Sequence, residues 1–289
     1  MAACQIDPQI GEVDRNIERI STAVTDAASA GAKVVVLPEA AITGYAFASL
    51  DEALAVARRA DAVADRVLVG LAETHRITIV CGTLEPTARE IYNAALVHTP
   101  DGRHFRYRKM HLPFLGVDRF TTPGPDAPRV FEVGGVRIGV LICYDLRFPE
   151  AARMCALDGA DLIVLPTNWP VGVSFHPNLF APARAAENHC YLLAADRVGT
   201  ERGTTVMGRS ILVDYDGMVL AQASDTDEET LFGEIDPEEA RATHVRKRPG
   251  EHEWDTIADR RPGLYERLTS PGVDRLRPAS ADQFSGDVE

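Results

Sequence analysis

Apolar residues follow two different spacings along the chain, and the spacing changes at regular intervals. Between residues 12 and 30 they recur every three or four positions, which predicts an amphipathic helix. The next stretch, "KVVVLPEA", lacks polar alternation and therefore predicts a strand covered on both faces that ends at Pro38. A helix over about 50–76 and strands at "ITIVCG", "YNAALVHT" and "RHFRYRK" follow, the last two joined by the turn sequence "PDG".

The same order of elements recurs after a loop rich in Pro and Gly at 112–128. The pattern predicts a strand leading to Cys143, a helix from Pro149, a strand "DLIVLP", a helix through "APARAAEN", a strand "CYLLAAD" and two hairpin-like strands near 206–214 and 218–223. The two halves resemble a weak internal repeat. Two sheets packed face to face with helices outside would bury all these apolar runs, so we expect an α/β fold: a four-layer α-β-β-α sandwich with two mixed sheets.

We expect residues 1–270 to form one domain. Beyond Pro237 the sequence is charged and rich in arginine, with "RKRPGEHEW" and "RRPGLYERL", which indicates an extended arm. Residues 271–289 are expected to form an extended or disordered tail.

Composition argues against several classes of partner. The formal net charge of −13 disfavours nucleic acid and anionic membranes. No apolar run approaches the roughly 20 residues that span a bilayer, and "MAACQIDPQIGEVDRN" lacks the basic and long apolar regions of a signal peptide. The five cysteines are scattered and odd in number, which favours reduced thiols over disulfides or zinc ligands, and the histidines show no metal-ligand spacing. We therefore expect a soluble cytoplasmic protein without a metal.

Polar residues of chemical interest stand where predicted strands end. Glu39 follows "VVVLP", Cys143 follows "GVLI", and Asn168 and Trp169 follow "LIVLPT". Lys109 ends the hairpin strand and is one of only three lysines in a chain rich in arginine. Taken singly, Cys143 fits an inert buried thiol and Lys109 a solvated lysine at a strand end.

Three motifs in this order resemble the nitrilase superfamily of carbon-nitrogen hydrolases, whose triad is Glu, Lys and Cys. They are "LPEAAITGY" around Glu39, "YRKMHLP" around Lys109 and "ICYDLRFPE" around Cys143, and the resemblance extends from "AACQIDPQIGEVDRNI" through "RRPGLYERL". It implies a hydrolase of linear amides that cleaves a non-peptide C-N bond through a thioester and releases ammonia and a carboxylic acid. It also implies a homodimer or higher homo-oligomer, and the alanine-rich "APARAAENHCY" and the arm suit a symmetric contact.

The resemblance assigns separate roles to the matched residues. Cys143 would be the nucleophile and Glu39 the acid and base that deprotonates it. Lys109 and the backbone N–H of Tyr144 would stabilise the oxyanion, so that no metal or organic cofactor is required. The family carries a second glutamate, for which Asp118 is the best match here, one methylene shorter; the alternative for Asp118 is a solvated loop acid.

The residues after the nucleophile bear on the substrate. "CYDLR" resembles the small-amide branch, whereas nitrile-hydrolysing members have Trp-Glu after the cysteine. Arg147 could bind a substrate carboxylate, as in an ω-amidase-like enzyme, or could form a structural ion pair with Glu150 or another acid. Tyr45, Asn168 and Trp169 are candidate pocket walls or, alternatively, loop and core packing.

Other functions remain open at this stage. An N-carbamoyl amide hydrolase or a nitrilase could use the same triad, and the natural substrate does not follow from the sequence. A papain-like hydrolase would pair Cys143 with His111 or His176, but would leave the Glu39 and Lys109 motifs unexplained. A non-catalytic binding protein could share the fold.

Overall fold

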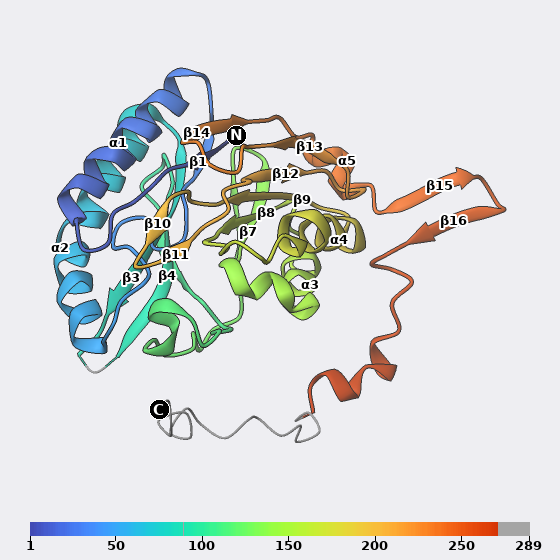
Figure 1. The fold of residues 1–289 in the computed structure, drawn as a ribbon. Coiled ribbons are helices and arrows are strands. Elements are labelled where there is room, and N and C mark those ends of the chain that lie inside the picture. Colours follow the sequence, from blue (N-terminus) through green and yellow to red (C-terminus); the bar gives the residue numbers. More distant parts are fainter. Residues whose placement is uncertain (89, 271–289) are drawn as a thin grey trace.

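The computed structural model describes residues 1–88 and 90–270. Two six-stranded sheets pack face to face, with two helices on the outer face of each (Figure 1). The covering helices are α1 (Val13–Ser29) and α2 (Leu50–His75) on one side and α3 (Pro149–Leu157) and α4 (Ala181–Asn188) on the other. The expected four-layer α-β-β-α sandwich with two mixed sheets is therefore confirmed.

The N-terminal sheet has the strand order β14-β1-β2-β3-β4-β5. Its three central neighbours β1, β2 and β3 run parallel, and the remaining pairs are antiparallel. The strands are β1 (Ala2–Gln5), β2 (Val34–Val36), β3 (Thr78–Pro86), β4 (Ile91–His98), β5 (His104–Arg108) and β14 (Glu229–Phe232).

The C-terminal sheet has the order β13-β12-β9-β8-β7-β6 and a similar parallel centre of β7, β8 and β9. The outer pairs are again antiparallel. The strands are β6 (Val130–Val133), β7 (Val136–Val140), β8 (Leu162–Pro166), β9 (Tyr191–Ala195), β12 (Ile211–Val213) and β13 (Val219–Gln222).

Strand β2 shows why the central strands carry no polar alternation. Val34 and Val36 join the apolar core between the two sheets, while Val35 packs under α1 and α2. Successive side chains of a strand point to opposite faces, so a strand inside a four-layer sandwich needs apolar residues at every position. Helix α2 begins where expected, because the Ser49 hydroxyl accepts a hydrogen bond from the Glu52 N–H.

The structure departs from the sequence prediction mainly at short elements. β1, β6 and β14 were not predicted, and the strand expected at 206–214 is only the short β12. Pairing in β7 ends at Val140, three residues before Cys143. The charged arm contains a helix and a hairpin that projects from the sandwich (Figure 1), namely α5 (Pro237–Arg241), β15 (His244–Arg248) and β16 (His252–Asp255).

Short helical turns complete the arm and the loops. They are η1 (Gly116–Arg119), η2 (Cys143–Arg147), η3 (His176–Phe180), η4 (Pro262–Leu264) and η5 (Glu266–Leu268), and a small hairpin is formed by β10 (Thr200–Glu201) and β11 (Thr204–Thr205). The tail predicted at 271–289 lies outside the described residues. Within the described part of the chain, no helix is both long enough and apolar enough to cross a bilayer.

Candidate active site

The two sheets contribute different members of the candidate triad. Glu39 follows β2 and Lys109 follows β5 in the N-terminal sheet, whereas Cys143 follows β7 in the C-terminal sheet. Lys109 Nζ lies 2.6 Å from Glu39 Oε1. Cys143 is close enough to both side chains for their charges to act on its pKa. The structure thus brings together the three residues singled out in the sequence.

Lys109 is completely buried between two carboxylates. Its Nζ donates to Glu39 Oε1 and, at 2.5 Å, to Asp118 Oδ2. Burial alone lowers the pKa of a lysine, but the charges of Asp118 and Glu39 together raise the pKa of Lys109 well above its ordinary value. The side chain therefore stays an ammonium at neutral pH, as a group that stabilises an oxyanion must.

Asn93 bridges the two carboxylates and was missed in the sequence. Its Nδ2 donates to Glu39 Oε1 at 2.7 Å and to Asp118 Oδ1 at 2.8 Å. The available signal was a lone amide in the apolar run "IYNAALVH", because a buried amide in a strand needs polar partners. Asn93 lies opposite the end of β5, where its carbonyl also accepts from the Lys109 N–H.

Glu39 retains one carboxylate oxygen for chemistry. Oε1 accepts from both Lys109 and Asn93, whereas Oε2 is buried and has no hydrogen-bond partner among the described residues. Burial raises the pKa of Glu39, and the neighbouring Asp118 adds to the effect while Lys109 opposes it. A carboxylate with a raised pKa and a free oxygen is suited to accept a proton and to return it.

Cys143 opens the turn η2 in a left-handed backbone conformation, with φ of 43°. This region is uncommon for a residue with a side chain and marks a position held by its surroundings. Burial and the charge of Glu39 raise the pKa of the Cys143 thiol well above its ordinary value, although Lys109 opposes them. The cysteine is therefore a thiol at neutral pH and needs a base to become a nucleophile.

Asp145 fixes the backbone around the nucleophile and was also missed as a functional residue. Its buried carboxylate accepts from the Ile142 N–H at 3.1 Å, from the His111 N–H at 3.0 Å and from the Tyr107 hydroxyl at 2.8 Å. It thereby ties the turn from the C-terminal sheet to β5 and the Lys109 segment. The "YD" after the cysteine was the signal, because a carboxylate at this buried turn requires several donors.

The two histidines considered as partners of Cys143 have other contacts. His111 Nδ1 lies 2.8 Å from Asp145 Oδ1, and its ring stacks on Phe148. His176 Nδ1 lies 3.0 Å from the Val173 carbonyl. The Cys143 thiol instead contacts the Asn168 carbonyl at 4.0 Å. This arrangement gives a Cys-His pair no support.

Asp118 is buried rather than solvated, which removes the alternative considered for it. Besides Lys109, it accepts from the Tyr45 hydroxyl at 2.9 Å and from Asn93. The Tyr45 hydroxyl oxygen also lies 3.2 Å from the Leu115 carbonyl oxygen, and the Val117 N–H donates to the Tyr45 carbonyl. These bonds draw η1 toward the Tyr45 loop, so a carboxylate one methylene shorter than glutamate still reaches Lys109.

Two glycines allow the segments of the site to approach closely. A Cβ at Gly82 would lie 2.6 Å from Glu39 Cα and 2.3 Å from the Pro38 carbonyl oxygen. A Cβ at Gly116 would lie 2.2 Å from the Tyr45 ring. A side chain at either position would push apart the backbone that carries the site.

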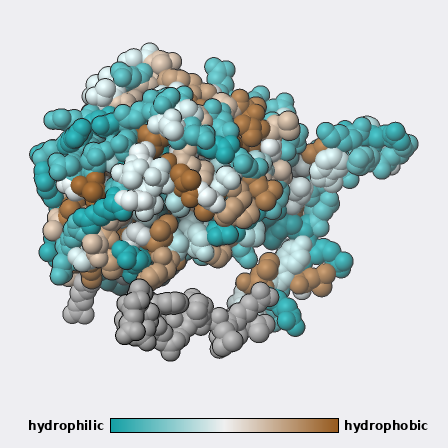
Figure 2. All heavy atoms as spheres, viewed as in Figure 1, coloured by the Kyte–Doolittle hydropathy of each residue, from teal (hydrophilic) through white to brown (hydrophobic). Residues whose placement is uncertain are grey.

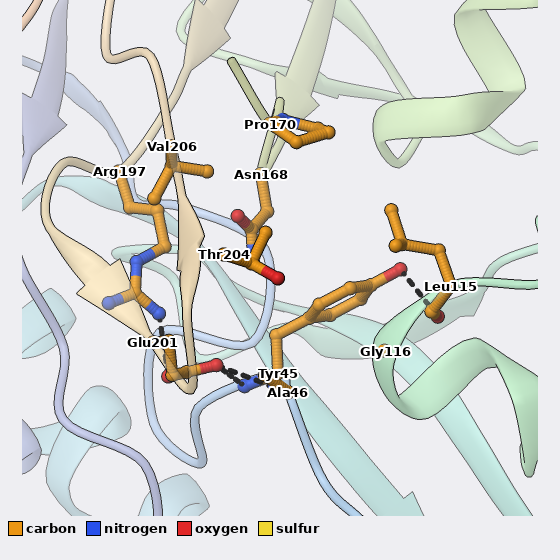
Figure 3. Close-up of a pocket in the computed structure, with 10 residues that line it drawn as sticks. All are labelled: Tyr45, Ala46, Leu115, Gly116, Asn168, Pro170, Arg197, Glu201, Thr204 and Val206. Atoms are coloured by element: carbon orange, nitrogen blue, oxygen red, sulfur yellow. Dashed lines mark hydrogen bonds and ion pairs between the residues drawn. The ribbon is translucent and has the colours of Figure 1, made fainter. Parts of the chain in front are cut away.

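A small cavity of about 30 Å³ adjoins the site (Figure 3). Tyr45 and Asn168 belong to its wall, and both also contact catalytic candidates, through Asp118 and through Cys143. The other lining residues are Ala46, Leu115, Gly116, Pro170, Arg197, Glu201, Thr204 and Val206. The expectation that Tyr45 and Asn168 are pocket walls agrees with this geometry.

Trp169 and Arg147 lie elsewhere. Trp169 is buried, stacks on His176 and does not belong to the cavity wall, which agrees with core packing. Arg147 is exposed, and its guanidinium lies over the rings of Phe175, Tyr144 and Phe180. Neither an ion pair with Glu150 nor a place in the cavity wall is found for Arg147 within residues 1–88 and 90–270.

A sequence profile described as Carbon-nitrogen hydrolase matches residues 1–245. The chain belongs to this family. Among its relatives, the protein named nitrilase of Pyrococcus abyssi is 39% identical over 237 residues, covering 82% of this chain and 89% of the relative. The 2-oxoglutaramate amidase of Bacillus subtilis is 31% identical over 242 residues, covering 83% of this chain and 92% of the relative.

Solved structures of the nitrilase superfamily share the fold. An amidase from Nesterenkonia sp. AN1 superposes with a TM-score of 0.80 at 26% sequence identity, and the match covers 92% of this chain and 98% of that one. The fold, the family and the amidase relatives together make this carbon-nitrogen hydrolase an enzyme of the amidase type.

Proposed function

We propose that this carbon-nitrogen hydrolase cleaves small linear amides through a thioester on Cys143. The observation that carries the proposal is that the two carboxylate oxygens of Glu39 have different surroundings. Oε1 binds Lys109, while the buried Oε2 has no hydrogen-bond partner in the described chain. An oxygen in this position can take the thiol proton without breaking the contact that holds Lys109.

The proposed reaction proceeds in two halves. Cys143 Sγ attacks the amide carbon as Glu39 takes the thiol proton, and Lys109 with the Tyr144 N–H stabilises the negative oxygen. Collapse of this intermediate breaks the C–N bond, and Glu39 gives the proton to the departing ammonia. Glu39 then deprotonates a water molecule that attacks the thioester, which releases the carboxylic acid and restores the thiol.

The neighbouring structures support a reactive cysteine and a small substrate. In the Nesterenkonia amidase the active-site cysteine carries acrylamide by Michael addition, and in another structure it carries the acetamide moiety of fluoroacetamide. A variant of that amidase is described in complex with butyramide. We extend this reactivity and this size of ligand to the present chain.

The enzyme is expected to hydrolyse butyramide with a kcat/KM at least about tenfold above that for butyronitrile, because its Tyr-Asp after the cysteine resembles the amidase branch. Ammonia release measured at matched concentrations of the two compounds tests this. A faster nitrile would assign the chain to nitrilases, and a faster N-carbamoyl compound to carbamoyl hydrolases, with the same triad.

We further propose a homodimer or higher homo-oligomer in which the arm contacts a second copy. The hairpin β15–β16 projects from the sandwich, and an isolated two-stranded hairpin is only marginally stable in water (Figure 1). Apolar residues gather in the segment after the hydrophilic hairpin (Figure 2), where Leu264 and Leu268 are 66% and 63% exposed. In α4, Ala181 and Ala185 are buried in the chain's own core. Ala183 and Ala186 are partly exposed, so these two residues would contact the second copy.

Light scattering at micromolar concentration is expected to give at least twice the chain mass of 31.4 kDa. The double variant Leu264→Asp/Leu268→Asp should shift the population toward the single chain, because charged residues at an apolar contact oppose association. Met218→Asp, at a residue 64% exposed and remote from the arm in sequence, is the matched control and should leave the mass unchanged. A single-chain mass for the unaltered protein would refute the proposal.

A cytoplasmic setting is also proposed. All five cysteines are free and buried, which suits a reducing compartment, and the nucleophile must remain a thiol.

A further inference from the structure

Among residues 1–88 and 90–270, the wall of the cavity beside the active site has two charged members, Arg197 and Glu201 (Figure 3). The other lining groups are an aromatic ring, aliphatic side chains, an amide, a hydroxyl and glycine. Which substrates can enter therefore depends strongly on whether this pair offers a free charge.

Arg197 does not offer one. Its Nε donates to the Val198 carbonyl, one terminal nitrogen donates to Glu201 at 2.7 Å, and the other donates to Asp7 at 2.8 Å and to the Pro8 carbonyl at 2.7 Å. The side chain is buried, so these contacts hold it in place. A guanidinium with two carboxylates and two carbonyls around it has little left for a carboxylate of the substrate.

Glu201 is equally engaged. One oxygen binds Arg197, and the other accepts from the backbone N–H groups of Tyr45 and Ala46 at 2.9 Å and 2.5 Å. Arg197 with Asp7 and Glu201 amounts to one positive and two negative groups, a net charge of one negative unit.

The charged group around Lys109, which contacts the hydroxyl end of Tyr45, has the same net charge. Lys109 is paired with both Glu39 and Asp118, which again leaves one net negative unit when both carboxylates are ionised. Tyr45 lines the cavity and contacts both groups through Glu201 and Asp118, so a substrate carboxylate there would exchange its hydration for two groups of negative net charge.

Among the described residues, the cavity wall holds no cation other than Arg197. Arg147, the cation that the sequence suggested for a substrate carboxylate, lies over aromatic rings and outside the cavity wall.

We infer that this enzyme takes amides whose acyl group is short and uncharged, and that the Arg197–Glu201–Asp7 group makes its cavity reject amides that carry a carboxylate. The inference rests on the proposed amide hydrolysis and specifies its substrate class. It separates the chain from relatives such as 2-oxoglutaramate amidase, whose named substrate is an acidic amide.

Three amides test the inference with the unaltered enzyme: butyramide, succinamide and succinamate. Succinamide and succinamate have the same number of heavy atoms and differ chiefly in charge. We expect butyramide and succinamide to be hydrolysed and the kcat/KM for succinamate to be more than about 30-fold below that for succinamide, because like charges at short range strongly disfavour binding. Equal values for these two, or a better succinamate, would overturn the inference. Hydrolysis of none of the three would instead refute the proposed function.

A gain of activity provides the second test. Thr204 lines the cavity but is exposed, so Thr204→Arg adds a cation at the rim without burying it. This variant should raise kcat/KM for succinamate relative to succinamide at least about fivefold, whereas the uncharged Thr204→Gln should leave that ratio unchanged. Arg147→Ala should also leave the ratio unchanged. A selective loss of succinamate hydrolysis in Arg147→Ala would assign carboxylate recognition to Arg147 and overturn the inference.

Discussion

Replacing Cys143 with alanine is expected to lower kcat for a small amide by more than about 10³-fold, because no other side chain at the site can form the thioester. The fold should be retained, since the substitution removes one buried sulfur atom and leaves the Asp145 bonds to the turn intact. Circular dichroism and ammonia release from the same preparation test both parts. Cys190→Ala, which removes another fully buried thiol, is the matched control and should keep most of the activity.

The same assignment is expected to appear in covalent labelling. Acrylamide should add to Cys143 and to no other cysteine, and peptide mass spectrometry would locate the adduct. Burial raises the pKa of Cys4 and of Cys190 to about 12, and no base comparable to Glu39 accompanies them in the described structure. An adduct or thioester on any of the other four cysteines would make the assignment of the nucleophile wrong.

Lys109→Met is expected to abolish turnover and also to lower the free energy of unfolding by about 3 to 5 kcal/mol, because removing one partner of a buried ion pair leaves the other uncompensated. Here two carboxylates, those of Glu39 and Asp118, would lose their shared cation. The complete burial of Lys109 between two acids is the reason that stability should fall as well as turnover.

The pH dependence of this variant follows from the same geometry. Without the ammonium, the pKa of Glu39 should rise further than burial and Asp118 already raise it. A carboxyl with a raised folded-state pKa stabilises the fold below its unfolded pKa and loses that contribution as pH increases through the folded pKa. Chemical denaturation should therefore show a larger defect at pH 8 than at pH 5.

A second substitution distinguishes the effect of the unpaired charges on stability from the effect of the altered packing. Lys109→Met/Asp118→Asn removes one of the stranded carboxylates and should regain part of the lost stability without regaining activity. If Lys109→Met unfolded at the same denaturant concentration as the unaltered enzyme, the ion pairs of Lys109 with Glu39 and Asp118 would not stabilise the fold as described here.

The sequence pointed to the candidate triad because each member stands directly after a predicted element and within a recognisable motif. "LPEAAITGY", "YRKMHLP" and "ICYDLRFPE" locate Glu39, Lys109 and Cys143 without any knowledge of contacts. Asn93 and Asp145 were not recognised as functional residues from the motifs of the sequence. Their importance lies in what they bond to across the fold, and those partners are set by the pairing of β4 with β5 and by the docking of the two sheets.

Long-range pairing also explains the elements that the sequence did not predict. β1 is only four residues long, and its partner β14 is more than two hundred residues away. A strand of this length has little periodicity of its own and is defined by the neighbours that complete its hydrogen bonds. The Arg197–Glu201 pair was missed for a related reason: its significance depends on Asp7 and on the Tyr45 loop, which the chain brings to the same wall only on folding.

The candidate triad draws its members from both sheets, so the proposed reaction depends on how the two sheets are aligned. Glu39 and Lys109 follow strands of the N-terminal sheet and Cys143 follows a strand of the C-terminal sheet, so a shift of one sheet along the other would separate the proposed nucleophile from its proposed base while every strand remained intact. Under the proposed mechanism, turnover therefore requires the packing of the inter-sheet core to keep the two sheets aligned. Substitutions at Val36 or Ile138, which pack in that core, can alter the reaction without contacting any reacting atom.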